Sequence, residues 1–217
     1  SFFSKREPYS KENLKGDLEN LESFYKNRGF LKFNVDSSSV SLSEDKKNIF
    51  ITVNISENDL FFNNKVSYAG DLPDAIDPFA IIQITQFIVP NNVFSQEALT
   101  YAEDQITSLM SNQGFSSAEV IASTEEAEKE NFVDITIFID PGQRTYVRKI
   151  NFSGNKRTHD VVLRREMRQM EGSWASDILI ENSKRRLDRL GYFKEVEYET
   201  SPVPGESDKI DINFTVE

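Results

Sequence analysis

One pattern occurs three times in this chain of 217 residues. A glycine followed by an aromatic residue stands at Gly29, Gly114 and Gly191. About 25 residues beyond each glycine, a segment of alternating apolar and polar residues ends: "IFITVNI" in the first copy, "VDITIFI" in the second and "KIDINFTV" in the third. Three matches at one offset predict an internal repeat, so we expect the chain to fold as three copies of one small unit.

The residues before each glycine carry apolar side chains at helical spacing. In the first copy these are Leu14, Leu18, Leu21 and Tyr25, and the stripes of the later copies are less regular. This spacing predicts an amphipathic helix in each copy. Glycine enters the left-handed backbone region without a side-chain penalty, so we expect it to end the helix and turn the chain into the first of two strands.

The second and third copies also begin alike. The predicted strands "KVSYAG" and "VRKINFSG" each end in glycine and precede a further helix. In the second copy Asp77 is the expected N-cap and Pro78 the first helical residue. In the third copy the helix is predicted over "DVVLRREMRQM", between Thr158 and Gly172. The repeating unit is therefore strand, helix, helix, strand, strand.

Counting back from the first glycine places the opening strand of the first copy before residue 1. We therefore predict one incomplete module (1–58) and two complete modules (59–140 and 141–217) in an α+β fold. Two helices cover only one face of each three-stranded sheet, and at least two strand edges per sheet are expected to stay unpaired. Such an edge can bind a partner that adds a strand.

Residue composition excludes several classes of site. The sequence has no cysteine and one histidine, His159, so disulfides, thiolate metal sites and multi-histidine sites within one chain are excluded. It contains no Gly-rich phosphate loop and no EF-hand pattern. We predict no catalytic, cofactor-binding or metal-binding residues. A hydrolase that acts through His159 is the alternative from another functional class.

The net charge of -11 is concentrated in the middle of the chain, where residues 59–140 hold 2 basic and 14 acidic side chains. Such a surface repels phosphate backbones, which argues against nucleic-acid binding. No apolar run approaches the roughly 18 residues of a membrane-spanning helix. The opening "SFFSKREPYS" has neither an initiator Met nor the apolar core of a signal peptide, so we expect a soluble fragment of a longer, mature protein.

The predicted helix over "DVVLRREMRQM" carries two side-chain stripes. The first is apolar and expected to be buried: Leu163, Met167 and Met170. The second is charged and lies beside it: Arg164, Arg168 and Glu171. Spacing alone favours a solvated helix face for the charged stripe, because exposed ion pairs are common and contribute little. A partner-binding site is the alternative.

The strand after Gly29 runs through "VDSSSVSLS". Val40 and Leu42 share one face of this strand and alternate with serines. This composition fits an edge strand that accepts another chain. It fits equally well a strand whose Val40 and Leu42 point under the helices.

The strand-helix-helix-strand-strand unit resembles the POTRA module of the Omp85 family. The last copy, "YVRKINFSGNKRTHDVVLRREMRQMEGSW" followed by "RLDRLGYF", is similar to the fifth POTRA module of the family members that assemble outer-membrane β-barrels. The first copy, "LKGDLENLESFYKNRGF" with "FNVDSSSVSLSEDKKNIFITVNI", is similar to their third module, so the middle copy would be the fourth. The resemblance covers essentially the whole chain. It implies mixed sheets with strand order 1-3-2 and two antiparallel helices.

This resemblance implies a function in the periplasm, at the outer membrane of a Gram-negative bacterium. The chain would be the arm of the barrel-assembly (BAM) complex that recruits lipoproteins and binds nascent outer-membrane proteins by β-augmentation. A membrane-anchoring β-barrel would begin just after Glu217. The alternative within the family is the POTRA arm of a two-partner secretion transporter, against which the "LRREMRQMEG" helix argues.

The resemblance also assigns a lipoprotein site to the last module. Glu171, Arg168 and Arg164 fall where a BamD-type lipoprotein docks in the family, which reverses the preference for a solvated face.

A second lipoprotein site falls in the first module. Val40 and Leu42 take the place of the hydrophobic pair of the edge strand that binds a BamB-type lipoprotein, and Asp36 begins that strand. The opening strand and first helix of this module are missing or replaced by "SFFSKREPYS", so this second site is expected to be incomplete. The partners of the acidic middle module stay unassigned.

Overall fold

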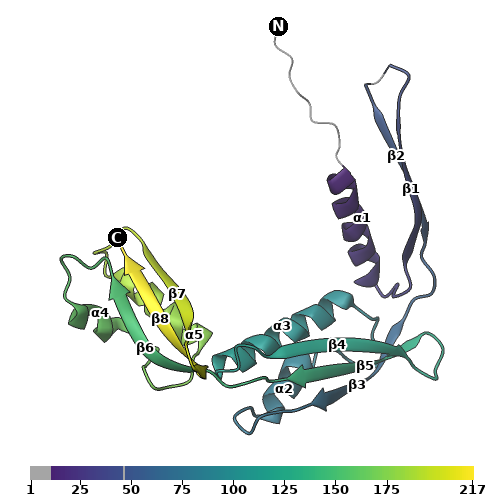
Figure 1. Ribbon diagram of the computed structural model, residues 1–217. Helices are drawn as coiled ribbons and strands as arrows, with labels where there is room; N and C mark the ends of the chain where they lie inside the picture. Colours follow the sequence, from purple (N-terminus) through teal and green to yellow (C-terminus); the bar gives the residue numbers. More distant parts are fainter. Residues whose placement is uncertain (1–10, 46) are drawn as a thin grey trace. The chain divides into compact units, whose positions relative to one another are not determined.

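The computed structural model describes residues 11–45 and 47–217 (Figure 1). In these residues the helices and strands follow in this order: α1 (Lys11–Lys26), β1 (Asn34–Leu42), β2 (Ile49–Ser56), β3 (Phe62–Gly70), α2 (Pro78–Thr85), α3 (Gln96–Asn112), β4 (Glu119–Glu126), β5 (Phe132–Asp140), β6 (Tyr146–Ser153), α4 (Asp160–Glu166), α5 (Asp177–Arg189), β7 (Val196–Val203) and β8 (Glu206–Val216). The opening segment, predicted to replace the first strand and helix of the first module, lies outside the described residues, as does Lys46.

The chain divides into two compact units. One contains the described residues up to 67 together with 85–102 and 122–137, and the other contains 68–84, 103–121 and 138–217. The middle repeat is therefore shared between the two units. None of the helices in the described ranges is long and apolar enough to cross a membrane.

Three small sheets account for all the strands of the described residues. Their strand orders are β1-β2, β3-β5-β4 and β6-β8-β7. In the last sheet β6 runs parallel to β8, and β7 runs antiparallel to it. Both complete modules thus have the strand order first-third-second, with the last strand of the module in the centre. This arrangement confirms the predicted α+β fold with mixed three-stranded sheets.

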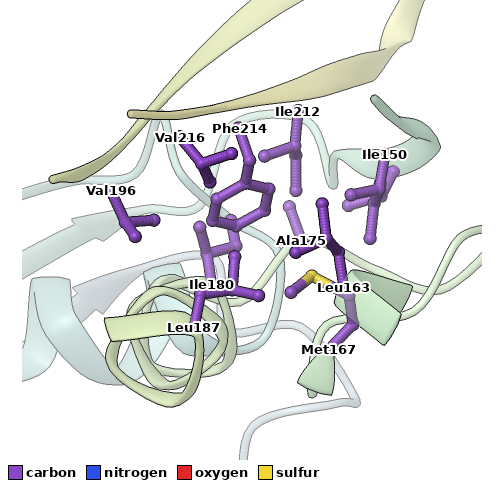
Figure 2. Close-up of a cluster of buried hydrophobic side chains, with 11 residues drawn as sticks. Ile150, Leu163, Met167, Ala175, Ile180, Leu187, Val196, Ile212, Phe214 and Val216 are labelled. Carbon is purple, nitrogen blue, oxygen red and sulfur yellow. The ribbon is translucent and has the colours of Figure 1, made fainter. Parts of the chain in front are cut away.

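The core of the last module lies between its sheet and its two helices (Figure 2). The central strand β8 contributes alternate side chains, because successive residues of a strand point to opposite faces. Its buried members are Ile212, Phe214 and Val216. Figure 2 shows these side chains pointing toward those of α4, its C-cap Met167 and α5: Leu163, Met167, Ile180 and Leu187. Burying each large apolar side chain stabilises the module by about 1.5–3 kcal/mol.

The glycine of each repeat ends its helix as predicted. Gly29 and Gly114 have φ of 94°, and Gly191 has φ of 68°. The first two also bind the linker that follows their module. The N–H of Phe61 donates to the Gly29 carbonyl (2.8 Å), and the N–H of Thr145 donates to the Gly114 carbonyl (2.7 Å). One residue type therefore both ends the helix and holds the next linker.

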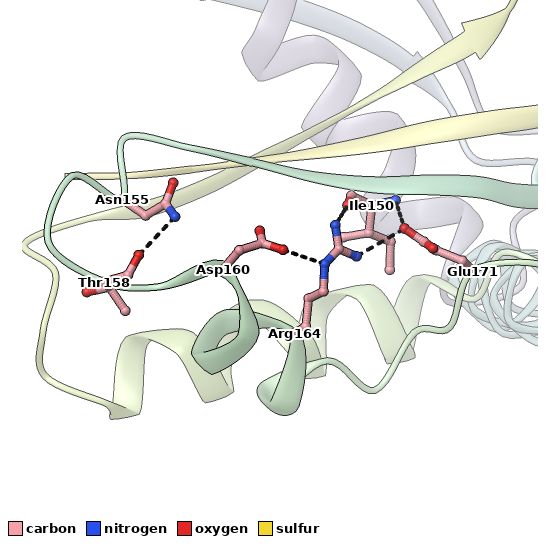
Figure 3. A network of polar contacts seen from close by, with 6 residues as sticks. All are labelled: Ile150, Asn155, Thr158, Asp160, Arg164 and Glu171. Carbon is pink, nitrogen blue, oxygen red and sulfur yellow. Dashed lines mark hydrogen bonds and ion pairs between the residues drawn. The ribbon is translucent and has the colours of Figure 1, made fainter.

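The starts of the first helices agree with the sequence in part. The N–H of Phe79 donates to Asp77 Oδ1 (2.9 Å), so Asp77 caps α2 as predicted. In the last module the N-cap of α4 is His159, which makes no side-chain capping bond and is exposed. Asn155 instead donates to the carbonyl of Thr158 (3.0 Å), which holds the turn before the helix (Figure 3).

Helix α4 is shorter than the predicted helix, which was wrong beyond Glu166. The hydroxyl of Ser183 on α5 accepts hydrogen bonds from the backbone N–H groups of Arg168 (2.8 Å) and Gln169 (3.1 Å). These donors bond across to α5 instead of to the preceding turn of α4, so the helix stops. Met170 consequently leaves the apolar stripe and is 62% exposed.

Gln169 is buried in the last module, whereas the sequence predicted that its neighbour Met170 would be buried. Its side chain is fully buried, and its Nε2 donates to the Ser173 hydroxyl and to the Trp174 carbonyl (2.9 Å each). Its Oε1 accepts from the N–H of Ser176 (2.9 Å). One amide therefore satisfies several backbone groups of the loop between α4 and α5, as a buried polar side chain must.

Candidate functional site

The backbone edges of the strands are the surfaces on which the predicted function depends. In the last module the outer edge of β6 is covered by the loop that follows α4. The N–H of Val147 donates to the Ser173 carbonyl (2.9 Å), and the N–H of Gly172 donates to the Val147 carbonyl (2.7 Å). This pair of bonds is the pattern of an antiparallel strand pair. The edge of β6 is therefore closed at its beginning.

Two side chains close the same edge further along (Figure 3). The N–H of Ile150 donates to Glu171 Oε1 (2.8 Å), and Arg164 Nη2 donates to the Ile150 carbonyl (3.0 Å). Arg164 also pairs with Glu171 (3.2 Å) and with Asp160 (2.6 Å). The three residues Ile150, Arg164 and Glu171, which we term the edge-closing network, satisfy backbone groups that another strand would otherwise bind.

The charged residues predicted for the last module therefore divide into two groups. Arg164 and Glu171 are brought together in the edge-closing network, and hydrogen bonds from Arg164 to Asp160 and then to Glu171 raise the pKa of Arg164. Arg168 lies outside the network, after the end of α4, and lines a groove against α5. The predicted continuous helical stripe of these three residues is wrong, because the helix ends between them.

The middle module closes its first strand in the same way. The N–H of Asn63 donates to the Asn92 carbonyl (2.9 Å), and the N–H of Asn91 donates to the Asn63 carbonyl (2.8 Å). In both complete modules the loop before the second helix thus pairs with the start of the first strand. The first strand of each complete module is therefore partly covered, and its start is not the open edge that the sequence predicted. The second strand of each module (β1, β4 and β7) lies at the other border of its sheet.

Strand β1 is the most exposed of these second strands. It pairs only with β2 among the described residues, with Val40 opposite Ile51 and Leu42 opposite Ile49. Val40 is 50% exposed and Leu42 is 60% exposed. The alternative that these two side chains point under the helices is therefore wrong. The strand offers both backbone groups along its outer edge and apolar side chains beside them.

Asp36 lies at an irregular position of strand β1. The register of the β1–β2 pair shifts between Val35 and Ser37, so Asp36 occupies a bulge. Its carboxylate accepts hydrogen bonds from Ser56 Oγ (2.6 Å) and Asn34 Nδ2 (2.8 Å), and these bonds lower the pKa of Asp36. Asp36 thus fixes the start of the hairpin by bonding to the facing strand.

The chemistry of the border strands differs between modules. Residues 37–42 of β1 contain no charged residue and no proline. Strand β7 of the last module carries Glu197, Glu199 and Pro202, which are residues that protect an edge from further pairing. Glu197 is also bound by Lys184 (3.1 Å). Of the border strands β1 and β7, β1 is therefore better suited to pair with an added strand.

Sequence reasoning missed a groove that contains four arginines. We term it the arginine groove, and its lining residues are Arg168, Leu179, Asn182, Arg185, Arg186 and Arg189. Its volume is about 270 Å³. The spacing of Asn182, Arg185 and Arg189 along α5 could have indicated one helix face. The approach of Arg168 depends on the early end of α4, which the sequence did not predict. The described residues contain no group of three or more metal-binding side chains.

All three modules match the sequence signature of one family. The POTRA family, described as "Surface antigen variable number repeat", matches residues 2–58, 64–142 and 145–217. The outer membrane protein assembly factor BamA of Neisseria meningitidis serogroup B is 28% identical over 216 residues, which are 100% of this chain and 27% of that protein. BamA of Buchnera aphidicola is 31% identical over 210 residues, which are 96% of this chain and 33% of that protein. The chain thus spans between a quarter and a third of the length of these relatives.

Solved structures give the same assignment. The crystal structure of Haemophilus influenzae BamA POTRA3-5 superposes with a TM-score of 0.76 at 26% identity, covering 100% of this chain and 84% of that chain. BamA from Haemophilus ducreyi lacking POTRA domains 1-3 superposes with a TM-score of 0.63 at 32% identity, covering 72% of this chain and 29% of that chain. The chain therefore belongs to the POTRA family and, over its whole length, is similar to the POTRA3-5 region of the assembly factor BamA.

Proposed function

We propose that this chain is the periplasmic arm of an outer-membrane barrel-assembly factor and binds other polypeptides by adding their strands to its sheets. The similarity to BamA proteins supports the setting, because those relatives are named as outer membrane protein assembly factors. The function is non-enzymatic and needs no cofactor, which fits a sequence with one histidine and no cysteine.

The observation that carries this proposal is the border of β1, which has no strand partner except β2 in the described residues. Its uncharged residues 37–42 lie at the border of a two-stranded sheet, and Val40 and Leu42 are half exposed or more. A peptide that pairs with this border gains backbone hydrogen bonds, which depend little on its sequence, and apolar contacts at alternate positions. Such binding suits a protein that receives many different precursors, namely nascent outer-membrane proteins.

We assign the first module's border strand to a BamB-type lipoprotein as well. Val40 and Leu42 would supply the apolar contacts, and Asp36 would set where the pairing begins because it occupies the bulge. The lipoprotein and a precursor strand would then compete for one edge.

A BamD-type lipoprotein would dock on the side of the last module that carries Arg164, Arg168 and Glu171. The side chains of Arg164 and Glu171 are 45% and 43% exposed, so their outer atoms can reach a partner while their inner atoms hold β6. Arg168 is exposed and forms no ion pair with the described residues. Docking on this side is consistent with a closed β6 edge, since the contact would use side chains instead of backbone groups.

Two proline variants test the β1 assignment. Successive N–H groups along a strand point to opposite edges. Of Ser39→Pro and Val40→Pro, one therefore removes a donor from the outer edge and the other removes a donor that pairs with β2. The probe is a labelled peptide with the sequence of the C-terminal strand of an outer-membrane barrel protein, titrated against the whole chain.

We expect one proline variant to keep the hairpin folded, as judged by its amide NMR signals, and to lose most of the peptide affinity. The other variant should disrupt the hairpin itself. Full peptide affinity in both variants would contradict the assignment. The same titration with the purified BamB-type lipoprotein tests whether that partner uses the same edge.

A further inference from the structure

The arginine groove combines a concave shape with an excess of positive charge. Four guanidinium groups line it, and the only carboxylate paired with any of them in the described residues is Glu166, whose Oε2 lies 2.6 Å from Arg186 Nη2. Arg185 donates to the amide oxygen of Asn182 (2.6 Å), which carries no charge. Three guanidinium groups therefore keep uncompensated charge within one groove of a protein whose net charge is -11.

The α5 helix explains only part of this cluster. Arg186 and Arg189 lie in its last turn, where positive side chains interact favourably with the helix dipole. Arg185 lies one position earlier, and Arg168 comes from the loop after α4. The side chain of Arg186 is 38% exposed, and the pair with Glu166 holds its Nη2, while its Nε is buried without a hydrogen-bond partner in the described residues. Neither helix propensity nor internal pairing accounts for arginines converging from two elements.

The shape of the groove indicates what it binds. Arg185 and Arg189 are four residues apart on α5, which places them about 6 Å apart along the axis, close to one helical turn. Carboxylates one turn apart on a partner helix have the same spacing. A row of carboxylates can contact these arginines, because a guanidinium binds a carboxylate through two parallel N–H groups. Half-buried Leu179 adds an apolar contact at one end.

We infer that the arginine groove binds an acidic segment of a protein partner, with carboxylates spaced by about one helical turn. The inference rests on the proposed function for the partner's identity, which is the lipoprotein that docks on the last module. It adds that this partner presents an acidic helix, and that Arg168 contacts it together with Arg185 and Arg189. Glu171 then has a positioning role, since it holds the strand edge and lies outside the groove.

The test uses the whole chain and two labelled helical peptides, one with glutamates at positions i, i+4 and i+7 and one with glutamines there. Fluorescence anisotropy measures binding to the unchanged chain, to the double variant Arg185→Gln and Arg189→Gln, and to a control. The control is Lys156→Gln with Arg157→Gln, which removes two positive charges from an exposed loop of the same module. Vesicles of phosphatidylglycerol, in a sedimentation assay, serve as a membrane probe.

We expect the glutamate peptide to bind the unchanged chain. Its affinity for the groove variant should be about tenfold lower, because hydrogen bonds between a guanidinium and a carboxylate are stronger than neutral ones. The control variant should bind the glutamate peptide as tightly as the unchanged chain. The glutamine peptide should bind the unchanged chain and the groove variant equally weakly. Added salt should weaken binding of the glutamate peptide. Equal weakening by the control variant would overturn the inference. So would groove-dependent binding to vesicles without binding to the peptide.

Titration of the purified BamD-type lipoprotein separates this inference from the proposed function. If the lipoprotein binds the groove variant as tightly as the unchanged chain, the groove is not its docking site and the inference fails while the proposed function stands. If the glutamate peptide needs the groove but the lipoprotein does not bind the chain at all, the acidic-segment site stands and the lipoprotein assignment fails.

Discussion

Glu171 accepts a hydrogen bond from the backbone N–H of Ile150 across 2.8 Å. The two residues belong to the loop after α4 and to the border strand β6, so the bond occupies a donor that another polypeptide would need. Together with the carbonyl of Ile150, which Arg164 binds, it closes one side of the last sheet. In each complete module the start of the first strand is therefore bound by the module's own residues, and the second strand lies at the other border of the sheet.

Substituting Glu171 tests this closure. In Glu171→Lys the N–H of Ile150 loses its acceptor, and a positive charge is placed beside Arg164. An unsatisfied buried donor costs about 1–3 kcal/mol, so the last module should unfold at a lower temperature. Amide exchange at Ile150 should become faster, and binding of a BamD-type lipoprotein should weaken.

Glu171→Gln is the matched control, because its amide oxygen still accepts the bond from Ile150. Glu171→Gln should lower the free energy of unfolding by less than about 1 kcal/mol. Unchanged exchange at Ile150 in the lysine variant would show that Glu171 does not close the edge.

Gln169 should be among the costliest polar side chains to replace in the last module. Gln169→Leu removes the acceptor of the Ser176 N–H and the donors to Ser173 and Trp174. We expect a loss of about 2–4 kcal/mol in the free energy of unfolding, because buried backbone groups lose their partners. The exposed neighbour gives the comparison: Met170→Gln should change the stability by less than about 0.5 kcal/mol. Equal effects of the two substitutions would contradict the burial of Gln169.

Replacing the glycines that end the helices by alanine should lower the free energy of unfolding by different amounts. A Cβ at Gly114 would lie 2.9 Å from Trp174 Cβ, whereas a Cβ at Gly191 would meet no atom within 4 Å. Gly191→Ala should cost about 1–2 kcal/mol from the left-handed backbone alone. Gly114→Ala should lower the free energy of unfolding by at least about 1 kcal/mol more, because Trp174 and Arg144 must also shift. Thermal unfolding followed by the fluorescence of Trp174, the single tryptophan, measures both. A smaller loss for Gly114→Ala than for Gly191→Ala would refute this ranking.

The hairpin of the first module should carry a pH dependence through Asp36. Hydrogen bonds from Ser56 and Asn34 lower its pKa in the folded state, so the carboxylate stabilises the hairpin above its unfolded pKa, about 3.9. That contribution is lost as the pH falls through the lower, folded pKa. An NMR titration should therefore find the pKa of Asp36 below the usual value in the unchanged chain.

Ser56→Ala should move the pKa of Asp36 back toward the usual value, because the first of these donors is gone. Ser39→Ala, on the same hairpin but away from the carboxylate, should leave it in place. A pKa that does not respond to Ser56→Ala would mean that the hydroxyl does not bind Asp36 in solution.

Local periodicity explains what the sequence could predict. The repeat, the α+β unit and the helix-ending glycines follow from patterns of side chains close together in the chain. In the third copy, Ser176, the N-cap of α5, and Ser183 on α5 stand at the helical spacing before Gly191, and both are buried. Their burial has a physical reason that the stripe itself did not reveal, since Ser183 binds the backbone where α4 ends.

Contacts between segments that are distant in the sequence explain what was missed. The end of α4 depends on Ser183, about 15 residues later, and the apolar stripe through Met170 gave no sign of it. The closed edge of β6 depends on Ser173 and Glu171, more than 20 residues after the strand begins. The arginine groove depends on the early end of α4, because Arg168 follows that helix and lines the groove together with residues of α5.

Amide exchange of the whole chain, with and without a saturating strand peptide from an outer-membrane barrel protein, tests the central claim most directly. Addition of a strand at β1 predicts slower exchange at alternate amides between Ser37 and Leu42, with Val147 and Ile150 of β6 unchanged. Peptide-induced protection at Val147 and Ile150, with none in β1, would contradict it.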